Sequence, residues 1–425
     1  MDDFIDFSAV DFFTDPSLVP DPHPYFDYLR GKAPVVREPH HGVVAVTGYD
    51  EAMALYKDID SFSSCIAVGG PFPPLPFEPS GEDISGLVEQ YRTKMPLHEH
   101  MVTMDPPDHT RARSVLSRLL TPARLKENQE FLWNLADEQL DEFVDRGECE
   151  FLEAYSRPYS LLAVANLLGV PEADHDEFRA VFGNSHTVGN LEHNPAAINP
   201  LDFLDEKFHF YIEDRRREPR GDVLSDLAAA KYPDGSTPEV VDVVRTATFL
   251  FGAGQETTAK LLGAALQILC DRPDLQQKLR DDRSLIPAFI EETLRMESPV
   301  KTTYRLARKS TCVGGVDVPA GTTVMVAPGA INRDPNRFED PHEFRLDRPN
   351  VREHIAFARG VHTCPGAPLA RVEGRVSLER ILDRMADIRA NEDKHGTLGD
   401  RHYSYAPSYI LRGLNELHIH FTPIR

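Results

Sequence analysis

Cys364 is the residue whose neighbours most clearly suggest chemistry. It lies in the segment 357–371, which reads FARGVHTCPGAPLAR. Glycines on both sides allow the backbone to approach another group closely, and Pro368 suits the first turn of a helix that begins just after the cysteine. The exposed N–H groups at a helix N-terminus stabilise a thiolate. The sulfur of Cys364 therefore suits either a nucleophile or a metal ligand.

The other four cysteines do not form a recognisable site. Cys65, Cys149, Cys270 and Cys312 are scattered along the chain. A disulfide framework or a zinc site needs cysteines paired at short spacing. We therefore expect free thiols and a reducing compartment.

A second group of residues lies midway along the longest predicted helix. The apolar pattern predicts a helix from Thr237 to about Cys270, with Thr237 as its cap and Pro238 in the first helical position. Its segment 253–258 reads AGQETT, and glycine and threonine are poor helix residues. A threonine hydroxyl can bond the carbonyl one turn earlier and open a local groove. This clustering indicates a functional constraint at the middle of the helix.

Two further pairs of residues have helical spacing. Glu292 and Arg295 are three residues apart, so they share a helix face and can form an ion pair. His109 and Arg113 are four apart on a helix that should begin near Asp108. Either pair alone is ordinary, because such spacings are common on protein surfaces.

Together, and in this order along the chain, these segments resemble the motifs of the cytochromes P450. The segment around Cys364 is similar to the cysteine-ligand loop of that family. The matching positions are Phe357, Gly360, His362, Cys364 and Gly366. The family usually has glycine where this chain has Ala358.

The resemblance implies that these residues bind haem b or take part in its chemistry. Cys364 would ligate the iron and Phe357 would shield the sulfur. The residues implied to bind haem propionates are His109, Arg113, Arg305 and His362, while Ala253, Gly254 and Gly366 would leave room for the macrocycle. Glu256 and Thr257 would direct protons to bound oxygen. A buried structural network is implied for Glu292, Arg295 and Arg348.

The fold implied by the resemblance is mainly α with a minor β region, and it places the haem between the long central helix and the cysteine loop. We expect an acidic leader over residues 1–19 and a single catalytic domain over residues 20–425. Within it, Val35-Val36 and Val43 to Val46 predict a β-hairpin, and segments 313–326 and 417–421 predict further strands. The Gly- and Pro-rich segment 69–79 predicts a long loop.

Composition restricts where the protein works and what it binds. The chain has 425 residues and a formal net charge of −22, so its mean field repels nucleic acid and anionic membranes. Its N-terminus lacks the basic and apolar regions of a signal peptide, and no run approaches the roughly 18 apolar residues that span a bilayer. We expect a soluble, cytoplasmic monomer.

A local reversal of charge predicts the redox partner. Residues 109–126 contain arginines and a lysine but no acidic residue, and basic residues outnumber acidic ones around the cysteine loop. In the family both segments lie on the cysteine side of the haem. A basic face on an acidic protein should steer an acidic ferredoxin, fed by its reductase, to that side. The residues assigned to this face are Arg111, Arg118, Arg124 and Arg371.

The predicted function is a monooxygenase that inserts one oxygen atom of O2 into a small, largely hydrophobic substrate. Family topology places segments 69–79, 186–199 and 410–414 around the pocket, and the candidate pocket residues are Phe249, Leu250, Val300, Thr302, Thr303 and Leu411. One alternative is a peroxide-driven peroxygenase, and another is a non-catalytic haem protein that binds a ligand. A third alternative uses Cys364 as a nucleophile with His362 as its base.

Overall fold

Helix dominates the structure. The computed structural model describes residues 6–116, 119–182, 191 and 200–424. The α-helices are α1 (His23–Lys32), α2 (Tyr49–Lys57), α3 (Ser85–Tyr91), α4 (Asp108–Leu116), α5 (Pro122–Asp141), α6 (Arg157–Leu168), α7 (His175–Phe182), α8 (Pro200–Arg217), α9 (Val223–Ala228), α10 (Val240–Asp271), α11 (Pro273–Asp281), α12 (Ile286–Met296), α13 (Pro328–Ile331), α14 (Ala367–Arg384) and α15 (Glu392–His395). None of these helices is long and apolar enough to cross a membrane. The expectation of a mainly α fold with a minor β region is confirmed.

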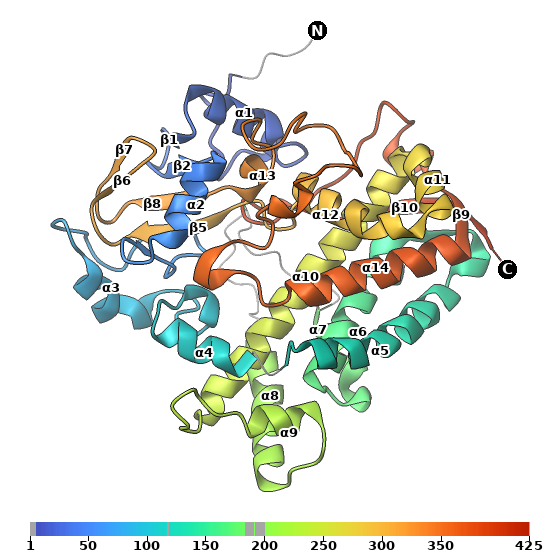
Figure 1. Ribbon diagram of the computed structural model, residues 1–425, viewed down its shortest axis with the longest axis horizontal. Coiled ribbons are helices and arrows are strands. Elements are labelled where there is room, and N and C mark those ends of the chain that lie inside the picture. Colours follow the sequence, from blue (N-terminus) through green and yellow to red (C-terminus); the bar gives the residue numbers. More distant parts are fainter. Residues whose placement is uncertain (1–5, 117–118, 183–190, 192–199, 425) are drawn as a thin grey trace.

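The strands are short. They are β1 (Val35–Arg37), β2 (Val44–Val46), β3 (Phe62–Ser63), β4 (Glu148–Glu150), β5 (Thr303–Ala307), β6 (Thr311–Val313), β7 (Val316–Val318), β8 (Thr323–Val326), β9 (Met385–Ala390) and β10 (His418–Pro423). In Figure 1 the five-stranded sheet lies on one side of the molecule and most helices lie on the other, with α10 running between them.

α10 is the central element of the fold. Its 32 residues correspond to about 48 Å at 1.5 Å per residue. The helix starts later than the sequence predicts, since Glu239 is its extended N-cap and Thr237 and Pro238 precede it. The Thr237 hydroxyl accepts a hydrogen bond from Lys231 instead of capping the helix. The predicted end of the helix is correct to within one residue.

The main sheet has the strand order β1-β2-β8-β5-β3. β1 and β2 form the predicted antiparallel hairpin, with Val35 opposite Val46. β8 pairs with β2 in parallel and with β5 in antiparallel orientation. These valine-rich strands fit a pleated, largely buried surface. The sheet thereby carries Arg305 on β5 toward the centre of the molecule, where this side chain is buried.

Two smaller sheets complete the β region. β6 pairs with β7, and β4, β10 and β9 form a three-stranded sheet in that order. The strands predicted in 313–326 and 417–421 are therefore confirmed. The segment 69–79 contains no helix or strand, as predicted.

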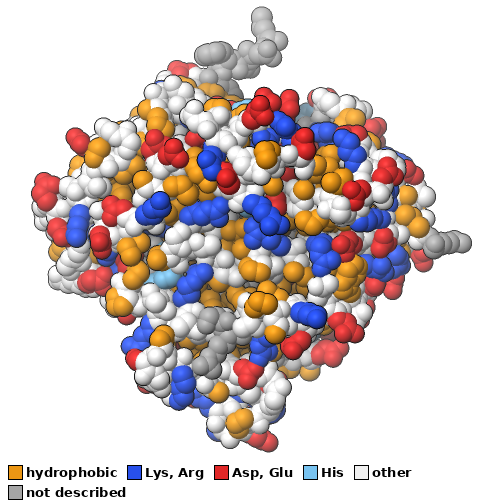
Figure 2. Space-filling model, in the orientation of Figure 1, with side chains coloured by type: hydrophobic (Ala, Val, Ile, Leu, Met, Phe, Trp, Pro, Cys, Tyr) orange, Lys and Arg blue, Asp and Glu red, His pale blue; other side chains and the backbone are white. Residues whose placement is uncertain are grey.

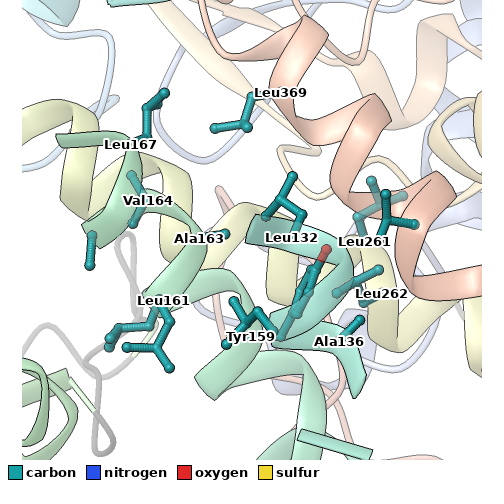
Figure 3. Close-up of a cluster of buried hydrophobic side chains, with 14 of the residues drawn as sticks. Leu132, Ala136, Tyr159, Leu161, Ala163, Val164, Leu167, Leu261, Leu262 and Leu369 are labelled. Atoms are coloured by element: carbon teal, nitrogen blue, oxygen red, sulfur yellow. The ribbon is translucent and has the colours of Figure 1, made fainter. Parts of the chain in front are cut away.

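The largest hydrophobic core lies among the long helices. Figure 3 shows part of this core, with side chains of α5, α6, α10 and α14 directed toward one another. The buried residues labelled there include Leu132, Ala136, Leu161, Val164, Leu261, Leu262 and Leu369. Burial of a leucine side chain contributes about 1.5–3 kcal/mol, so this core holds α14 firmly against α10.

The described part of the predicted leader packs onto the rest of the protein. Phe12 and Phe13 are 3% and 0% exposed and belong to a second core cluster. Phe13 contacts the rings of Tyr304 and Tyr409. Asp11 forms an ion pair with His41 at 2.8 Å. Residues 6–19 thus share a core with β5 and the C-terminal loop.

Candidate functional site

Cys364 lies on the loop that leads into α14, drawn in orange at the centre of Figure 1. The backbone N–H groups of Gly366 and Ala367 hydrogen-bond its sulfur. Its own N–H donates to the carbonyl of Phe357 at 2.8 Å. Burial raises the pKa of the Cys364 thiol, and the two N–H groups and nearby arginine charges oppose this rise. A cation at the sulfur shifts the equilibrium between thiol and thiolate toward the thiolate. The environment of Cys364 therefore suits a metal ligand.

The turn before Cys364 depends on two residues with positive φ. Gly360 has φ 71°, and a β-carbon there would lie 2.5 Å from the carbonyl oxygen of Tyr56. Ala358, at the position where the family usually has glycine, has φ 55°. A β-carbon in the left-handed region costs about 1–2 kcal/mol. The loop therefore retains its turn at this position despite the alanine.

Four basic side chains meet beside this loop. His109 of α4 lies against His362, with ring centroids 4.1 Å apart. Arg113 donates to the carbonyl of Thr363 at 2.6 Å, and Arg305 of β5 is buried. Burial, assisted by neighbouring positive charges, lowers the pKa of His109 to about 4 and that of His362 to about 2. The structure thus brings together the four residues to which propionate binding was assigned.

This basic cluster fits an external anionic group. Both ring nitrogens of His109 are buried without a hydrogen-bond partner. Asp105 lies close by, but its carboxylate already accepts hydrogen bonds from Ser63, Ser64 and Arg92. A small pocket lined in part by Arg305 and His362 lies against the cluster. Carboxylates such as the haem propionates would satisfy these buried donors.

α10 exposes a short stretch of its surface near residue 253. Ala253 is exposed, although most of the helix on either side is buried or half-buried. The hydroxyl of Thr257 donates to the carbonyl of Ala253 at 2.8 Å, which is the bond to the preceding turn that the sequence predicts. Glu256 pairs with Lys260, one turn later, at 3.1 Å. A small residue at an exposed mid-helix position fits the close approach of a flat macrocycle.

Gly254 serves a different purpose from the one assigned to it. A β-carbon there would lie 3.3 Å from a methyl carbon of Val164 on α6. Ser160 of α6 donates to the carbonyl of Gln255 at 2.8 Å in the same helix contact. The assignment to haem binding is wrong because neighbours on a helix point about 100° apart. Ala253 and Gly254 therefore face different surroundings, and Gly254 allows α6 and α10 to pack closely.

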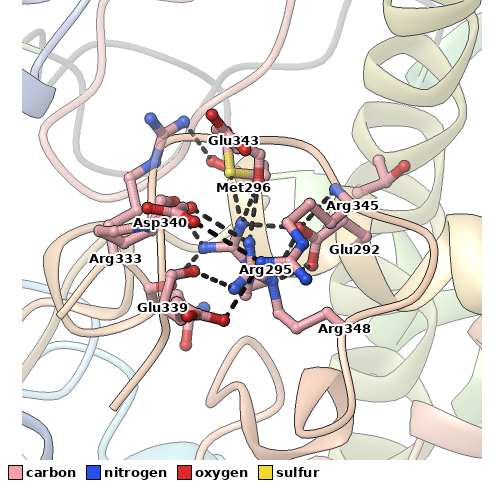
Figure 4. A network of polar contacts seen from close by, with 12 residues as sticks. Glu292, Arg295, Met296, Arg333, Glu339, Asp340, Glu343, Arg345 and Arg348 are labelled. Carbon is pink, nitrogen blue, oxygen red and sulfur yellow. Dashed lines mark hydrogen bonds and ion pairs between the residues drawn. The ribbon is translucent and has the colours of Figure 1, made fainter. Parts of the chain in front are cut away.

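Glu292, Arg295 and Arg348 form one buried network (Figure 4). Arg295 donates two hydrogen bonds of 2.8 Å to the Glu292 carboxylate, and Arg348 donates a third at 3.0 Å. The remaining N–H groups of both arginines reach backbone carbonyls between residues 332 and 343. All three side chains are at most 1% exposed. A fully satisfied network of this kind fixes the long loop after α13 against α12.

The substrate-pocket candidates differ in exposure. The Thr302 hydroxyl is fully buried and donates to the carbonyl of Tyr409 at 2.6 Å, so its assignment as a polar anchor is wrong. Leu250 and Leu411 are buried within core clusters. The candidates that keep partial exposure are Phe249, Val300 and Thr303. The predicted pocket segment 186–199 lies outside the described residues except at position 191.

The arginines assigned to the partner face have acidic partners within the chain. Arg124 pairs with a carboxylate of α9, and Arg111 lies 4.0 Å from one in the loop before α10. Arg371 donates two hydrogen bonds to Glu291 of α12. Their partners come from distant parts of the sequence, which the charge run alone does not reveal, and the assignment of these three arginines to the partner face stays a prediction. Arg118 lies outside the described residues.

Sequence reasoning missed Glu291 and His354. His354 is 2.9 Å from Glu291 and both side chains are buried. Hydrogen bonds from His354 and Arg371 lower the pKa of the Glu291 carboxyl to about 2, against the effect of burial. The available signal was the pair of consecutive glutamates, Glu291 and Glu292, in a helix whose other residues are mostly apolar.

Comparison with known proteins agrees with this geometry. The family model described as Cytochrome P450 matches residues 191–386. Cytochrome P450 144 of Mycobacterium tuberculosis is 32% identical over 94% of this chain and 89% of its own length. For 6-deoxyerythronolide B hydroxylase of Saccharopolyspora erythraea the identity is 32%, over 92% of this chain and 93% of that protein. The solved structure of Mycobacterium marinum cytochrome P450 CYP150A6 in the substrate-free form is 68% identical, covers 99% of this chain and 100% of its own, and superposes with a TM-score of 0.94. Likeness along nearly the whole chain shows that this protein belongs to the cytochrome P450 monooxygenase family, whose members use a cysteine-ligated haem b.

Proposed function

We propose that this protein inserts one oxygen atom of O2 into a small, largely hydrophobic organic substrate, with electrons from a ferredoxin. The observation that carries this proposal is the Cys364 sulfur, hydrogen-bonded by the N–H groups of Gly366 and Ala367 at the start of α14. Haem bound to that sulfur supplies the activation of O2, because a thiolate ligand favours cleavage of the O–O bond. The relative named 6-deoxyerythronolide B hydroxylase supports hydroxylation as the type of reaction.

The basic cluster binds and orients the haem. Arg113 and Arg305 present planar guanidinium groups, which match carboxylates with two parallel hydrogen bonds. His109 and His362 are neutral at pH 7 because burial lowers their pKa values. The ring of His109 has no hydrogen-bond partner and offers an N–H donor, while Nε2 of His362 is 3.0 Å from the Ser64 hydroxyl. These four side chains would hold the haem propionates, and the sulfur of Cys364 would hold the iron.

Glu256 and Thr257, at the middle of α10, would supply protons for this chemistry. The Thr257 hydroxyl donates to the Ala253 carbonyl, so its oxygen retains lone pairs that accept from water. Lys260 holds Glu256 by a half-buried ion pair. Glu256 would take up a proton from solvent and pass it through water to the neighbourhood of the Thr257 hydroxyl.

The partly exposed apolar residues support a hydrophobic substrate. Phe249 lies one helical turn before Ala253 and is half-buried. Thr303 is the first residue of β5, Val300 precedes that strand by three residues, and both are also half-buried. Apolar walls with one hydroxyl are typical of small-molecule pockets. The Thr303 hydroxyl donates to the Ala67 carbonyl at 3.4 Å, a weak bond that substrate can replace.

Charge distribution supports a ferredoxin as the electron donor. Figure 2 shows Lys and Arg side chains spread across the middle of the face on which the loop before α14 lies. Lys126 of α5 and Arg352 of the loop are exposed, while the whole chain carries a net charge of −22. Cations on such a protein steer an acidic partner to this face.

The first test is the visible spectrum of reduced, carbon monoxide-treated protein, for wild type and Cys364→Ala. We expect a strongly red-shifted Soret band that the substitution abolishes. Turnover with NADH, reductase and ferredoxin then tests the electron source. Product formed with peroxide alone, and not with ferredoxin, would show a peroxygenase, and ligand binding without product would show a non-catalytic haem protein. Thr257→Ala should keep NADH consumption while product per NADH falls.

A further inference from the structure

We propose that Glu291, His354 and Arg371 form a clamp that holds Phe357 and, through it, the sulfur of Cys364. The proposal rests on the haem-thiolate function above and assigns the three residues as positioning residues. They come from α12, from the loop after α13 and from α14. None of them belongs to the basic cluster or to the network around Glu292.

The clamp is built on one buried carboxylate. Glu291 is 3% exposed. Arg371 donates to both of its oxygens, at 2.5 and 3.0 Å, and Nε2 of His354 is 2.9 Å from one of them. Because the arginine fork binds in a bidentate manner, its orientation as well as its position is fixed.

Phe357 lies beside both partners of this carboxylate. The Arg371 guanidinium stands 4.7 Å from the centre of the Phe357 ring, and the His354 ring centroid is 5.9 Å from it. The carbonyl of Phe357 accepts the Cys364 N–H at 2.8 Å. Any displacement of Phe357 therefore acts directly on the backbone of the sulfur-bearing residue.

Hydrogen bonds at His354 set its tautomer and the path of the loop. Nδ1 of the imidazole accepts the N–H of Ala356 at 3.2 Å, so Nε2 carries the proton that is donated to Glu291. The next residue along the loop, Ile355, donates its N–H to the side chain of Asn332 at 2.7 Å. The three residues before Phe357 are thus each tied to a defined partner.

This arrangement gives Arg371 a role other than partner docking. Its side chain is 37% exposed, but its Nε and one terminal nitrogen are bound to Glu291 and its plane covers Phe357. Groups that orient a metal ligand from outside the coordination sphere typically change metal affinity about 10–100-fold when removed. We infer that the clamp sets how firmly the thiolate stays on the iron.

The test compares Arg371→Met and Glu291→Gln with a matched control, Arg375→Met. Arg375 lies one turn later on α14, is paired with Glu379 at 3.1 Å, and contributes to neither the clamp nor the basic cluster. For each holoprotein, two rates are measured. The first is the rate at which the carbon monoxide complex loses its red-shifted Soret band and gains the unshifted band of haem without a thiolate ligand. The second is the rate of haem transfer to apomyoglobin. Ferredoxin affinity is measured in parallel.

We expect both rates to rise about tenfold or more in Arg371→Met and Glu291→Gln, with Arg375→Met equal to wild type. If Glu291→Gln fails to fold, the half-exposed Arg371→Met decides the question. Wild-type rates in Arg371→Met with a weaker ferredoxin affinity would overturn the clamp and restore the docking role. A wild-type protein without any red-shifted band would instead refute the proposed function itself.

Discussion

The imidazole rings of His109 and His362 lie against each other, with centroids 4.1 Å apart and planes at 45°. They come from α4 and from the loop before α14, which are far apart in the sequence. Both rings are neutral at pH 7, because burial and the neighbouring arginines lower their pKa values. A neutral imidazole pair beside Arg113 and Arg305 donates to an anion without adding further like charge.

Removal of one ring should weaken haem binding. A hydrogen bond to a charged group contributes about 1.5–3 kcal/mol, so His109→Leu should raise the rate of haem loss to apomyoglobin about tenfold or more. His402→Leu is the control, since His402 lies exposed on the surface, with 73% of its side chain accessible. Equal rates in the two variants would contradict a role for His109 in binding the propionates.

Ala358→Gly should stabilise the protein. Ala358 has φ 55°, and relief of the left-handed strain should raise the free energy of unfolding by about 1 kcal/mol. Urea titration followed by circular dichroism measures this difference. Gly360→Ala should instead lower the free energy of unfolding, because its β-carbon would lie 2.5 Å from the Tyr56 carbonyl oxygen. A loss of stability in Ala358→Gly would show that the methyl group packs favourably enough to outweigh the strain.

Glu292→Gln should be severely destabilising. The substitution leaves the Arg295 and Arg348 guanidiniums buried without a countercharge, which costs about 3–5 kcal/mol. The matched control is Glu153→Gln, which breaks a half-exposed ion pair with Arg157, four residues later, and should cost no more than about 0.5 kcal/mol. The midpoint of thermal unfolding of both holoproteins checks the prediction. Similar midpoints for Glu292→Gln and Glu153→Gln would mean that the buried network contributes little to stability.

Glu373→Gln should alter the dependence of stability on pH. Burial raises the pKa of Glu373 to about 8, partly offset by a hydrogen bond from Thr258. The pKa in the unfolded chain is about 4.3. Because the folded pKa is the higher one, the stability from the protonated form is complete below about pH 4.3 and is lost as the pH rises to 8.

The wild type should therefore lose up to a few kcal/mol across this window relative to Glu373→Gln, which does not titrate. Urea unfolding of both proteins at several pH values measures the difference between them, and other titrating groups cancel in that difference. A difference that stays constant with pH would show that Glu373 is ionised in the folded protein.

Local features of this protein follow from the sequence alone. The turn and helix start around Cys364, the β1-β2 hairpin, the end of α10 and the bond from Thr257 to Ala253 all depend on residues within a few positions of one another. Backbone preferences and helical spacing decide such features, and the order of the motifs identifies the family. The start of α10 was misplaced by two residues, because extended backbone continues through Glu239 after Pro238.

Only the tertiary structure decided which side of an element each residue faces and what it meets there. Gly254 was expected at the haem but meets Val164 of α6, and Thr302 was expected in the pocket but is buried against the Tyr409 carbonyl. The partners of Arg124 and Arg371 lie in α9 and α12, far away in sequence. Charge runs and spacing describe one segment at a time, whereas burial and ion pairing depend on the segments that folding places against it. For this reason a stretch without acidic residues does not reveal which of its arginines form ion pairs within the chain, and the clamp around Phe357 could be found only in three dimensions.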